Sequence, residues 1–338
     1  MIPLFKVFMS EEAKHDVAKV LDSGYIGQGE VVEQFEGDLR EWFGWDYLAT
    51  VNSATSGLHL CVHMVDSPIF SASPMTCTAS NMPILANGSH IDWVDINTET
   101  LNMDLRKADR DTPAVIPLWA GNSNLDGECP RDTIIDAAHA LGVDVQALFN
   151  KGARFIVFSF QAIKHVTCGD GGVVLFRDKA DMERAKLLRW YGIERGAPAG
   201  DFRCEANIQE YGFKFHMNDI NAAIGRANLK HAEYLIDESR RCADDYNNYL
   251  QCDLLDYSAD CSYWIYTMLV DDKDGMIKRL KDNDIMSSKV HERNDKHTAF
   301  RSYQQHLPEL DEVNDKILSI PCGWWVHDTQ HIIDAVNG

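Results

Sequence analysis

Apolar residues recur at helical spacing in two stretches near the start of the chain. Residues 10–22 follow this pattern behind Ser10, a residue type favoured at helix N-termini, and residues 30–43 repeat it after a glycine-rich turn at 24–29. Both stretches are therefore predicted to be amphipathic helices. Their inward faces are expected to consist of Val17, Val20 and Leu21 in the first helix, and of Val31, Phe35, Leu39 and Trp42 or Phe43 in the second.

Short apolar runs, several of them rich in β-branched residues, follow in the next part of the chain. They alternate with helical or turn segments, among them predicted helices at 58–64 and 178–190. This alternation is typical of an α/β fold with a mostly parallel sheet. In the helix at 178–190, Met182, Leu187 and Leu188 are expected to face inward. The predicted strands are 47–51, 91–94, 114–119, 133–135, 155–160 and 172–176.

The last third of the chain has the pattern of a compact α+β unit. We place a domain boundary near residue 230, which gives a large domain (1–230, with the N-terminal segment) and a small C-terminal domain (231–338). The elements expected around and after this boundary are a loop at 192–212, a helix at about 217–234, a long helix that continues to 250, a strand at 263–270, a helix at 273–283 and a candidate strand at 286–290.

Composition narrows the classes of function. The chain carries 32 Lys and Arg against 52 Asp and Glu, a net charge of −20, which disfavours binding to nucleic acid or to an anionic membrane surface. There is no long apolar run and no signal-peptide pattern at the N-terminus. The nine cysteines form no C-x-x-C pair, and the 13 histidines show no spacing of metal ligands. A cytoplasmic protein without a metal site is expected.

Three short motifs place reactive or anion-binding groups where chemistry is common. Ser53, Ala54 and Thr55 form a small-residue turn between a strand and a helix, where backbone N–H groups and the helix dipole favour an anion. Asp136 ends an apolar strand, and Lys164 follows Ser159 ahead of a glycine-rich turn. If each motif stood alone, a simpler interpretation would be favoured. The turn at Ser53 would be an ordinary helix cap, Asp136 would cap a helix beginning at 137, and Lys164 would be a surface lysine.

Taken together and in this order, the motifs match the needs of pyridoxal 5′-phosphate (PLP). That cofactor requires a lysine that forms an imine, an acid that keeps the pyridine nitrogen protonated, and donors for its phosphate. The stretch FSFQAIKHVTCGDGGVV, with IIDAAHALG and VNSATSGLHL upstream, resembles the DegT/DnrJ/EryC1/StrS aminotransferases, which act on nucleotide-linked keto-sugars. The resemblance continues through LLRWYGIER, YGFKFHMNDINAAIG, SYWIYTMLV, VHERNDKHTAF and IPCGWW, and so covers nearly the whole chain.

The resemblance implies a fold and a set of roles. The fold is that of aspartate aminotransferase (fold type I), and the family forms homodimers whose sites are completed by the neighbouring subunit. Lys164 would form the internal aldimine and then carry the proton between the substrate carbon and C4′. Asp136 would pair with the pyridine nitrogen, and His139 would lie beside the ring near its 3′ oxygen. The phosphate would be bound by the Ser53-Ala54-Thr55 turn and by Ser159.

Two positions depart from the family pattern. Cys77 stands in Pro74-Met75-Thr76-Cys77 where the family has a large aromatic residue that stacks on the cofactor ring. Lys214 stands where the family commonly has an asparagine that reaches the phosphate across the dimer, and a lysine serves the same purpose. One branch of the family has histidine in place of the lysine and removes a hydroxyl group. Retention of Lys164 ahead of His165 favours transamination.

Four further residues are candidate substrate contacts. Tyr25 and Gln28 lie in a glycine turn that resembles the substrate-side loop of the family, although the turn alone is equally well read as structural. His291 lies in a very polar segment that by itself predicts a solvated loop. Trp324 belongs to a tryptophan pair that fits either the core or a surface on which a sugar stacks.

The predicted function is a PLP-dependent aminotransferase. It would move an amino group from an amino acid, with glutamate as the expected donor, to a nucleotide-linked keto-deoxysugar through the Lys164 aldimine, passing through pyridoxamine phosphate (PMP). Two alternatives remain open: a non-catalytic protein that binds PLP or a nucleotide-sugar, and a PLP-dependent sugar dehydratase on the same fold.

Overall fold

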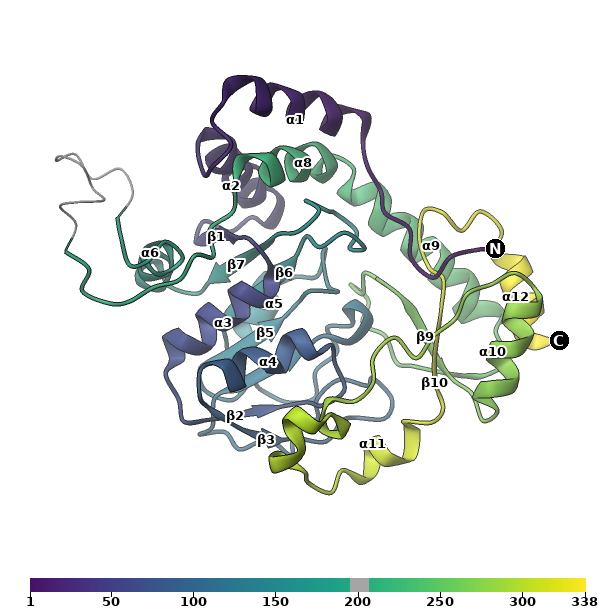
Figure 1. Ribbon diagram of the computed structural model, residues 1–338. Coiled ribbons are helices and arrows are strands. Elements are labelled where there is room, and N and C mark those ends of the chain that lie inside the picture. Colours follow the sequence, from purple (N-terminus) through teal and green to yellow (C-terminus); the bar gives the residue numbers. More distant parts are fainter. Residues whose placement is uncertain (195–206) are drawn as a thin grey trace.

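A seven-stranded sheet forms the centre of the computed structural model, which describes residues 1–194 and 207–338 (Figure 1). The strands lie in the order β1-β7-β6-β5-β4-β2-β3. Only β7 runs antiparallel to its neighbours, β1 and β6, while the other pairs are parallel. The strands are β1 (Leu48–Val51), β2 (Ile69–Ala72), β3 (His90–Trp93), β4 (Ala114–Pro117), β5 (Thr133–Asp136), β6 (Ala153–Ser159) and β7 (Gly172–Phe176).

Both faces of this sheet are covered by helices, which explains why the central strands β6 and β7 are mostly apolar and buried. Along β6, Phe155 and Val157 pack into one core with α3 (Ala54–Val65), α4 (Thr78–Ala86) and α6 (Lys179–Leu188). Ile156 and Phe158 point to the other face and pack with α2 (Glu30–Phe43), α5 (Val145–Asn150) and α8 (Asp219–Leu229). The side chains alternate because successive residues of a strand face opposite sides.

The N-terminal helix, α1 (Glu11–Ser23), packs against α8 at the edge of this domain. It begins where the sequence predicted, because the Ser10 hydroxyl accepts a hydrogen bond from the Ala13 amide and caps the helix. One predicted inward residue is wrong, since Leu21 is 54% exposed. Leu187 in α6 is likewise more exposed than predicted, at 37%.

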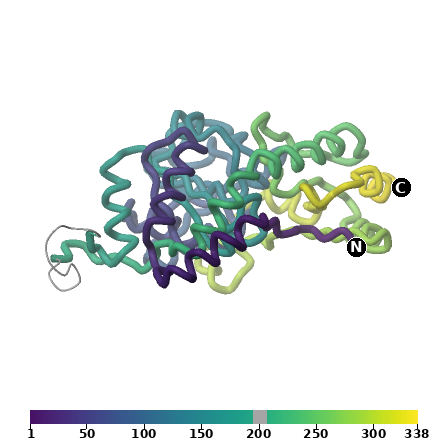
Figure 2. The backbone as a smooth tube through the Cα atoms, turned by 90° about the horizontal axis from the view of Figure 1, so that it is seen from above, coloured from purple at the N-terminus to yellow at the C-terminus, as the bar shows by residue number. Residues whose placement is uncertain are grey.

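The C-terminal part has its own apolar core around a three-stranded antiparallel sheet with the order β10-β9-β8. Residue Ile2 pairs with Ile285, so the start of the chain lies against this part, and both termini lie at the same end of the molecule (Figure 2). The boundary near residue 230 stays a prediction. The elements of this part are α9 (Ala232–Tyr249), β8 (Asp253–Leu254), β9 (Tyr266–Leu269), α10 (Lys273–Asp282), α11 (Pro308–Val313), β10 (Ile317–Ile320) and α12 (Thr329–Asn337), with short 3-10 helices at Asn294–Lys296 and Thr298–Tyr303. A further 3-10 helix, Trp119–Gly121, follows β4 in the large domain.

Some sequence predictions of elements were wrong. Strand β2 was missed, and the candidate strand at 286–290 is an irregular segment with a single bridge from Ser288 to Ser319. The two helices predicted between 217 and 250 are present as α8 and α9, but the first ends at Leu229 rather than near 234. Helix α3 begins at Ala54, earlier than predicted. Part of the predicted loop at 192–212 lies outside the described residues.

Candidate active site

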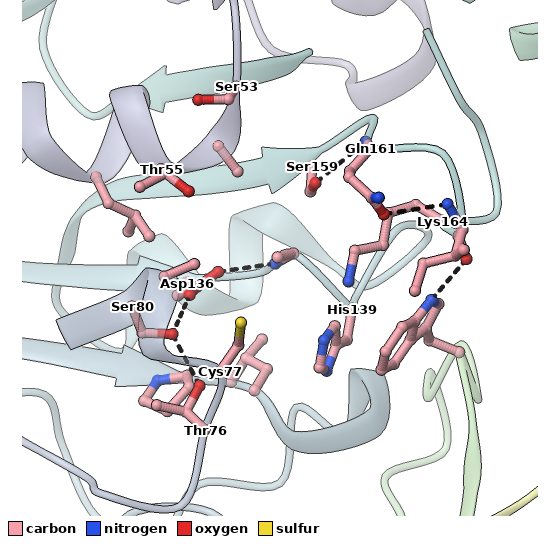
Figure 3. A pocket seen from close by; sticks show the side chains of 18 of the residues that line it. Ser53, Thr55, Thr76, Cys77, Ser80, Asp136, His139, Ser159, Gln161 and Lys164 are labelled. Carbon is pink, nitrogen blue, oxygen red and sulfur yellow. Dashed lines mark hydrogen bonds between the residues drawn. The ribbon is translucent and has the colours of Figure 1, made fainter. Parts of the chain in front are cut away.

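A cavity of about 320 Å³ lies at the carboxyl ends of β4, β5 and β6, between the first turns of α3 and α4 (Figure 3). Open α/β sheets place ligands at this edge of the sheet. Trp264 and His291 from the C-terminal part complete the wall of the cavity. Nine of the residues singled out in the sequence line it: Ser53, Ala54, Thr55, Cys77, Asp136, His139, Ser159, Lys164 and His291.

One end of the cavity is suited to an anion. Ser53 caps α3, because its hydroxyl accepts a hydrogen bond from the Ser56 amide at 3.1 Å. Ala54 and Thr55 occupy the first helical turn, where backbone N–H groups have no partner within the helix. Backbone segments approach closely here, since a Cβ atom on Gly172 would lie 2.7 Å from the Ala54 nitrogen. The helix N-terminus therefore offers free donors and partial positive charge to a phosphate group.

Asp136 and Ser159 point to the same face of the sheet as α3. They follow Ile134 and Val157 at a spacing of two residues, and both precede turns at strand ends. The Asp136 carboxylate accepts hydrogen bonds from the Ser80 hydroxyl at 2.6 Å and from the Ala138 amide at 3.0 Å. Burial nevertheless raises the pKa of Asp136, against the lowering by these donors and by the Lys164 charge. A buried carboxylate of this kind is stabilised by a cationic N–H donor.

Lys164 enters the cavity from the turn that follows β6. The Lys164 amide donates to the Gln161 carbonyl at 3.0 Å, and the Gln161 side chain accepts from the Ile163 amide, so the turn is internally fixed. The Lys164 Nζ atom lies 3.8 Å from the centre of the Trp264 ring. Burial lowers the pKa of Lys164 to about 8, although Asp136 and Cys77 favour its charged form. Near neutral pH an appreciable fraction of this amine is therefore uncharged.

Two histidines lie beside the lysine. The His139 ring stacks on Trp264 with ring centres 3.8 Å apart, and it lies nearly parallel to His291 at 5.9 Å. Burial lowers the pKa of His139 well below its usual value and that of His291 to about 4, and the Lys164 charge lowers both further. Both imidazoles are therefore neutral near pH 7, each able to donate one hydrogen bond and accept another.

A polar clamp holds His291 and Cys77 in place. The Asn294 amide donates to the Pro74 carbonyl at 2.8 Å, and its side chain donates to the Thr76 carbonyl at 2.7 Å. The segment that carries His291 is thereby fastened to the loop that carries Cys77. The Cys77 side chain points into the cavity opposite Ser159 and Lys164 (Figure 3).

Four residues singled out in the sequence lie outside this cavity. Lys214 is exposed, and Tyr25, 83% exposed, lies in the same turn as Gln28 beside a separate cavity of about 550 Å³ between α1, α2 and α8. Trp324 contacts Lys6, whose Nζ atom lies 4.8 Å from the ring centre. A small void beside Trp324 reaches the far side of Lys164.

Sequence reasoning missed several residues that build the cavity. Ser80 and Thr76 form a hydrogen-bonded pair behind Asp136, with their hydroxyl oxygens 2.8 Å apart. Gln161 shapes the lysine turn, and Trp264 forms one wall. Ser80 lies one helical turn after Thr76 in α4, a helix that the sequence analysis did not predict, and its contact with Asp136 spans 56 residues. Trp264 lies in SYWIYTMLV, one of the stretches that resemble the family, but no local pattern around it indicated a role in the site.

This arrangement fits PLP residue by residue. The start of α3 would offer N–H donors to the phosphate, Asp136 would offer an acceptor to the pyridine N–H, and Lys164 would offer the amine. Within residues 1–194 and 207–338, no group of three or more His, Cys, Asp and Glu residues is placed to hold a metal ion. The fold and the site together define a PLP enzyme of fold type I.

Comparison with known proteins gives the family. The chain belongs to the DegT/DnrJ/EryC1/StrS aminotransferase family, whose profile matches residues 8–118 and 132–337. It is 31% identical over 277 residues to an uncharacterised protein of Methanocaldococcus jannaschii, covering 73% of this chain and 69% of that protein. The predictions of the family, the fold type, the enzyme class and the cofactor are therefore confirmed.

Solved structures agree with this membership. AtS13 from Actinomadura melliaura is 36% identical, with a TM-score of 0.92 over 100% of this chain and 98% of that one. The sugar aminotransferase CalS13 from Micromonospora echinospora is 32% identical, with a TM-score of 0.91 over 100% and 99% of the two chains. A more distant likeness, to PseC of Helicobacter pylori at 23% identity, concerns the fold. In the described part of the chain, no helix is both long and apolar enough to span a bilayer.

Proposed function

We propose that this enzyme transfers an amino group from an amino acid, with glutamate as the expected donor, to a nucleotide-linked keto-deoxysugar. The membership of the aminotransferase family and the 32% identity to a sugar aminotransferase support this substrate class. The observation that carries the proposal is the placement of Lys164, Asp136 and the start of α3 around one cavity. The same three groups bind and activate PLP in the arrangement that the family requires.

Bound PLP supplies an aldehyde that captures amines and a ring that withdraws electrons. Lys164 is the group that we propose for the covalent bond to the cofactor and for the proton transfer that follows. Its amine is held in a buried cavity where its pKa is about 8, so it can both accept and release a proton near neutral pH. Asp136 would keep the ring nitrogen of the bound cofactor protonated, because its buried carboxylate can accept a hydrogen bond from that N–H.

The remaining cofactor contacts follow from position. The N–H groups of Ala54 and Thr55, together with the hydroxyl groups of Ser53 and Ser159, are proposed to surround the phosphate. His139 is proposed to lie against the ring, since it projects into the cavity from the turn after β5. The side chain of Cys77 is proposed to cover part of the ring face.

Substrate contacts and assembly complete the proposal. His291 is proposed to contact the sugar, because its neutral ring faces the cavity and is fixed by the neighbouring Asn294. Tyr25, Gln28 and Trp324 are proposed as contacts farther out. We propose a homodimer in which Lys214 reaches the phosphate of the neighbouring subunit, since this exposed lysine lies outside its own cavity. A cytoplasmic location stays a prediction.

The test is spectroscopic. Purified protein mixed with PLP is expected to develop the visible absorbance of a lysine-bound cofactor, and excess glutamate is expected to convert it to the PMP spectrum. Lys164→Ala should lose the covalent band and turnover of keto-sugars, while Lys281→Ala, at an exposed position of α10, serves as a lysine control outside the cavity. Normal turnover by Lys164→Ala would overturn the proposal. A bound cofactor without amine transfer would favour the non-catalytic alternative, and loss of a sugar hydroxyl would favour the dehydratase.

A further inference from the structure

Trp264 stands out among the cavity residues because it contacts the reactive lysine directly. The Lys164 Nζ atom lies over the indole ring, 3.8 Å from its centre. Aromatic faces attract ammonium groups, tryptophan most strongly, and the attraction grows when water is excluded. The ring is only 4% exposed, so most of its surface is shielded from solvent.

The indole is also fixed relative to the lysine. Its Nε1–H donates a hydrogen bond of 2.9 Å to the carbonyl of Ile163, the residue before Lys164. The Trp264 amide donates to the Ala120 carbonyl at 3.0 Å. Two aromatic rings also pack against the indole, with ring centres at 3.8 Å for His139 and 4.7 Å for Phe5. Trp264 therefore has little freedom to move away from the lysine turn.

From this geometry we propose that Trp264 is a positioning residue for Lys164. Its ring face holds the amine beside the cavity whenever that amine is not bonded to the cofactor. A lysine whose four-carbon chain is released would otherwise sample many rotamers. Contact with the indole would keep the Lys164 amine close to the reacting atoms while the cofactor is bonded to the substrate rather than to the lysine. The inference rests on the proposed covalent role of Lys164.

The indole face also favours the charged form of the amine. Several other titratable groups face Lys164 and must stay constant in any test: Asp136, Cys77, His139, His165 and His291. A ring that only filled space would have the opposite influence, because its removal admits water and raises the pKa of a buried lysine. Removal of the ring should therefore lower the pKa of Lys164 if the indole attracts the ammonium group, and raise it if the indole only fills space.

The experiment measures the pKa of Lys164 in the full-length protein without cofactor. The rate at which Lys164 reacts with 1-fluoro-2,4-dinitrobenzene is followed against pH by mass spectrometry of its peptide. Trp264→Leu is expected to lower the apparent pKa of Lys164 by about 0.5 to 1.5 units. Trp264→Phe keeps a ring face and is expected to fall between this variant and the wild type. An unchanged or raised pKa in Trp264→Leu overturns the inference.

Two further comparisons separate the contact from a general effect on packing. Trp93→Leu removes another buried tryptophan, 4% exposed, whose ring packs near Phe300 and lies outside the cavity, and it should leave the pKa of Lys164 unchanged. Biosynthetic replacement of all eight tryptophans by fluorinated analogues weakens the ring face without changing its shape. The pKa of Lys164 should then fall stepwise with each added fluorine, even if Trp264→Leu does not fold, and a flat response overturns the inference.

A separate experiment distinguishes failure of the proposed function from failure of the role proposed for Trp264. Borohydride reduction of the wild-type protein with PLP fixes the cofactor on Lys164 if the covalent role is right. Absence of that product would refute the role of Lys164, whereas the apoenzyme titration would still report whether the indole holds the amine. If the product forms and the titration is flat, the function stands and the role of Trp264 is wrong.

Discussion

The Ser80 hydroxyl donates a hydrogen bond of 2.6 Å to the Asp136 carboxylate and so links the first turn of α4 to the end of β5. The Thr76 hydroxyl lies 2.8 Å from that of Ser80 and extends the chain of hydrogen bonds away from the cavity. The Ala138 amide occupies the other carboxylate oxygen. Asp136 is thereby oriented from two sides before any ligand arrives, which reduces the reorganisation needed to receive a pyridine N–H.

Removing the Ser80 hydroxyl should weaken cofactor binding. Ser80→Ala leaves the buried carboxylate with one donor fewer, which costs about 1–3 kcal/mol and raises the pKa of Asp136 further. We expect the Kd for PLP, measured by absorbance titration, to rise about tenfold. Ser80→Thr keeps the hydroxyl and serves as the control. Equal affinities for PLP in wild type and Ser80→Ala would show that Ala138 alone suffices to orient Asp136.

The ion pair of Glu36 and Arg189 should dominate the acid stability of the large domain. The Arg189 Nη1 atom lies 2.7 Å from the Glu36 Oε1 atom, and both side chains are only 6% exposed. Burial alone would raise the pKa of Glu36, but Arg189 and Lys186 lower it to about 2. The stabilisation is therefore fully present above the ordinary pKa of 4.5 and is lost as the pH falls toward 2.

Glu36→Gln should remove this pH dependence together with much of the stability. An unpaired Arg189 remains buried in the variant, so we expect a loss of about 3–5 kcal/mol in the free energy of unfolding near pH 7. Urea unfolding at pH 7 and at pH 3 measures both effects. The difference between wild type and variant should shrink at the lower pH, and a constant difference would contradict the assignment. Glu41→Gln, on the exposed side of α2, is the matched control.

The sequence predicted those site residues whose position is marked by a local pattern, and it missed those that act through contacts distant in the chain. Lys164, Asp136 and the turn at Ser53 sit at strand and helix ends, where spacing and residue type carry the signal. Ser80 acts on a residue 56 positions away and Trp264 on one 101 positions away, and no local pattern reports such contacts. These two residues became visible only when the tertiary structure brought them together.

The fold shows the same limit. Strand β2 (Ile69–Ala72) lies between serine- and proline-containing segments that read as a loop, yet it pairs with both β3 and β4. Only Ile69 and Phe70 in this short strand favour strand conformation by residue type, and pairing with two neighbours adds the rest. Leu21 lies on an apolar face by helical spacing but is exposed, because periodicity alone does not tell which neighbour covers a position.

Cys77 provides a test of where the cofactor ring lies. Its side chain lines the cavity and is partly exposed, so it should react with iodoacetamide in the protein without cofactor. Saturating PLP should slow this reaction strongly, while Cys252, which is also partly exposed but lies in the C-terminal part, should react at an unchanged rate. Peptide mass spectrometry separates the two rates. Equal labelling of Cys77 with and without PLP would place the ring elsewhere.

A larger residue at the same position should strengthen binding. Cys77→Phe adds an aromatic face to the cavity wall, and stacking of aromatic rings contributes about 0.5–1.5 kcal/mol beyond the buried area. We expect the Kd for PLP to fall about threefold or more. Cys77→Ala, which removes the sulfur without adding a ring, should change the Kd in the opposite direction. Weaker binding of PLP by Cys77→Phe than by Cys77→Ala would mean that the side chain at this position does not cover the ring.

The close approach of β7 to the start of α3 gives the last prediction. A Cβ atom on Gly172 would lie 2.7 Å from the Ala54 nitrogen and 2.8 Å from the Phe158 carbonyl oxygen, both backbone atoms. Gly172→Ala must therefore shift the start of α3, where the phosphate is proposed to bind, at a cost of about 1–3 kcal/mol. Thermal unfolding and the Kd for PLP should both worsen. Gly37→Ala, whose Cβ atom would meet nothing within 4 Å in α2, should instead stabilise the protein by about 0.5–1 kcal/mol and leave PLP binding unchanged. If Gly172→Ala lowers the unfolding temperature but leaves the Kd for PLP unchanged, then the start of α3 is not the phosphate site.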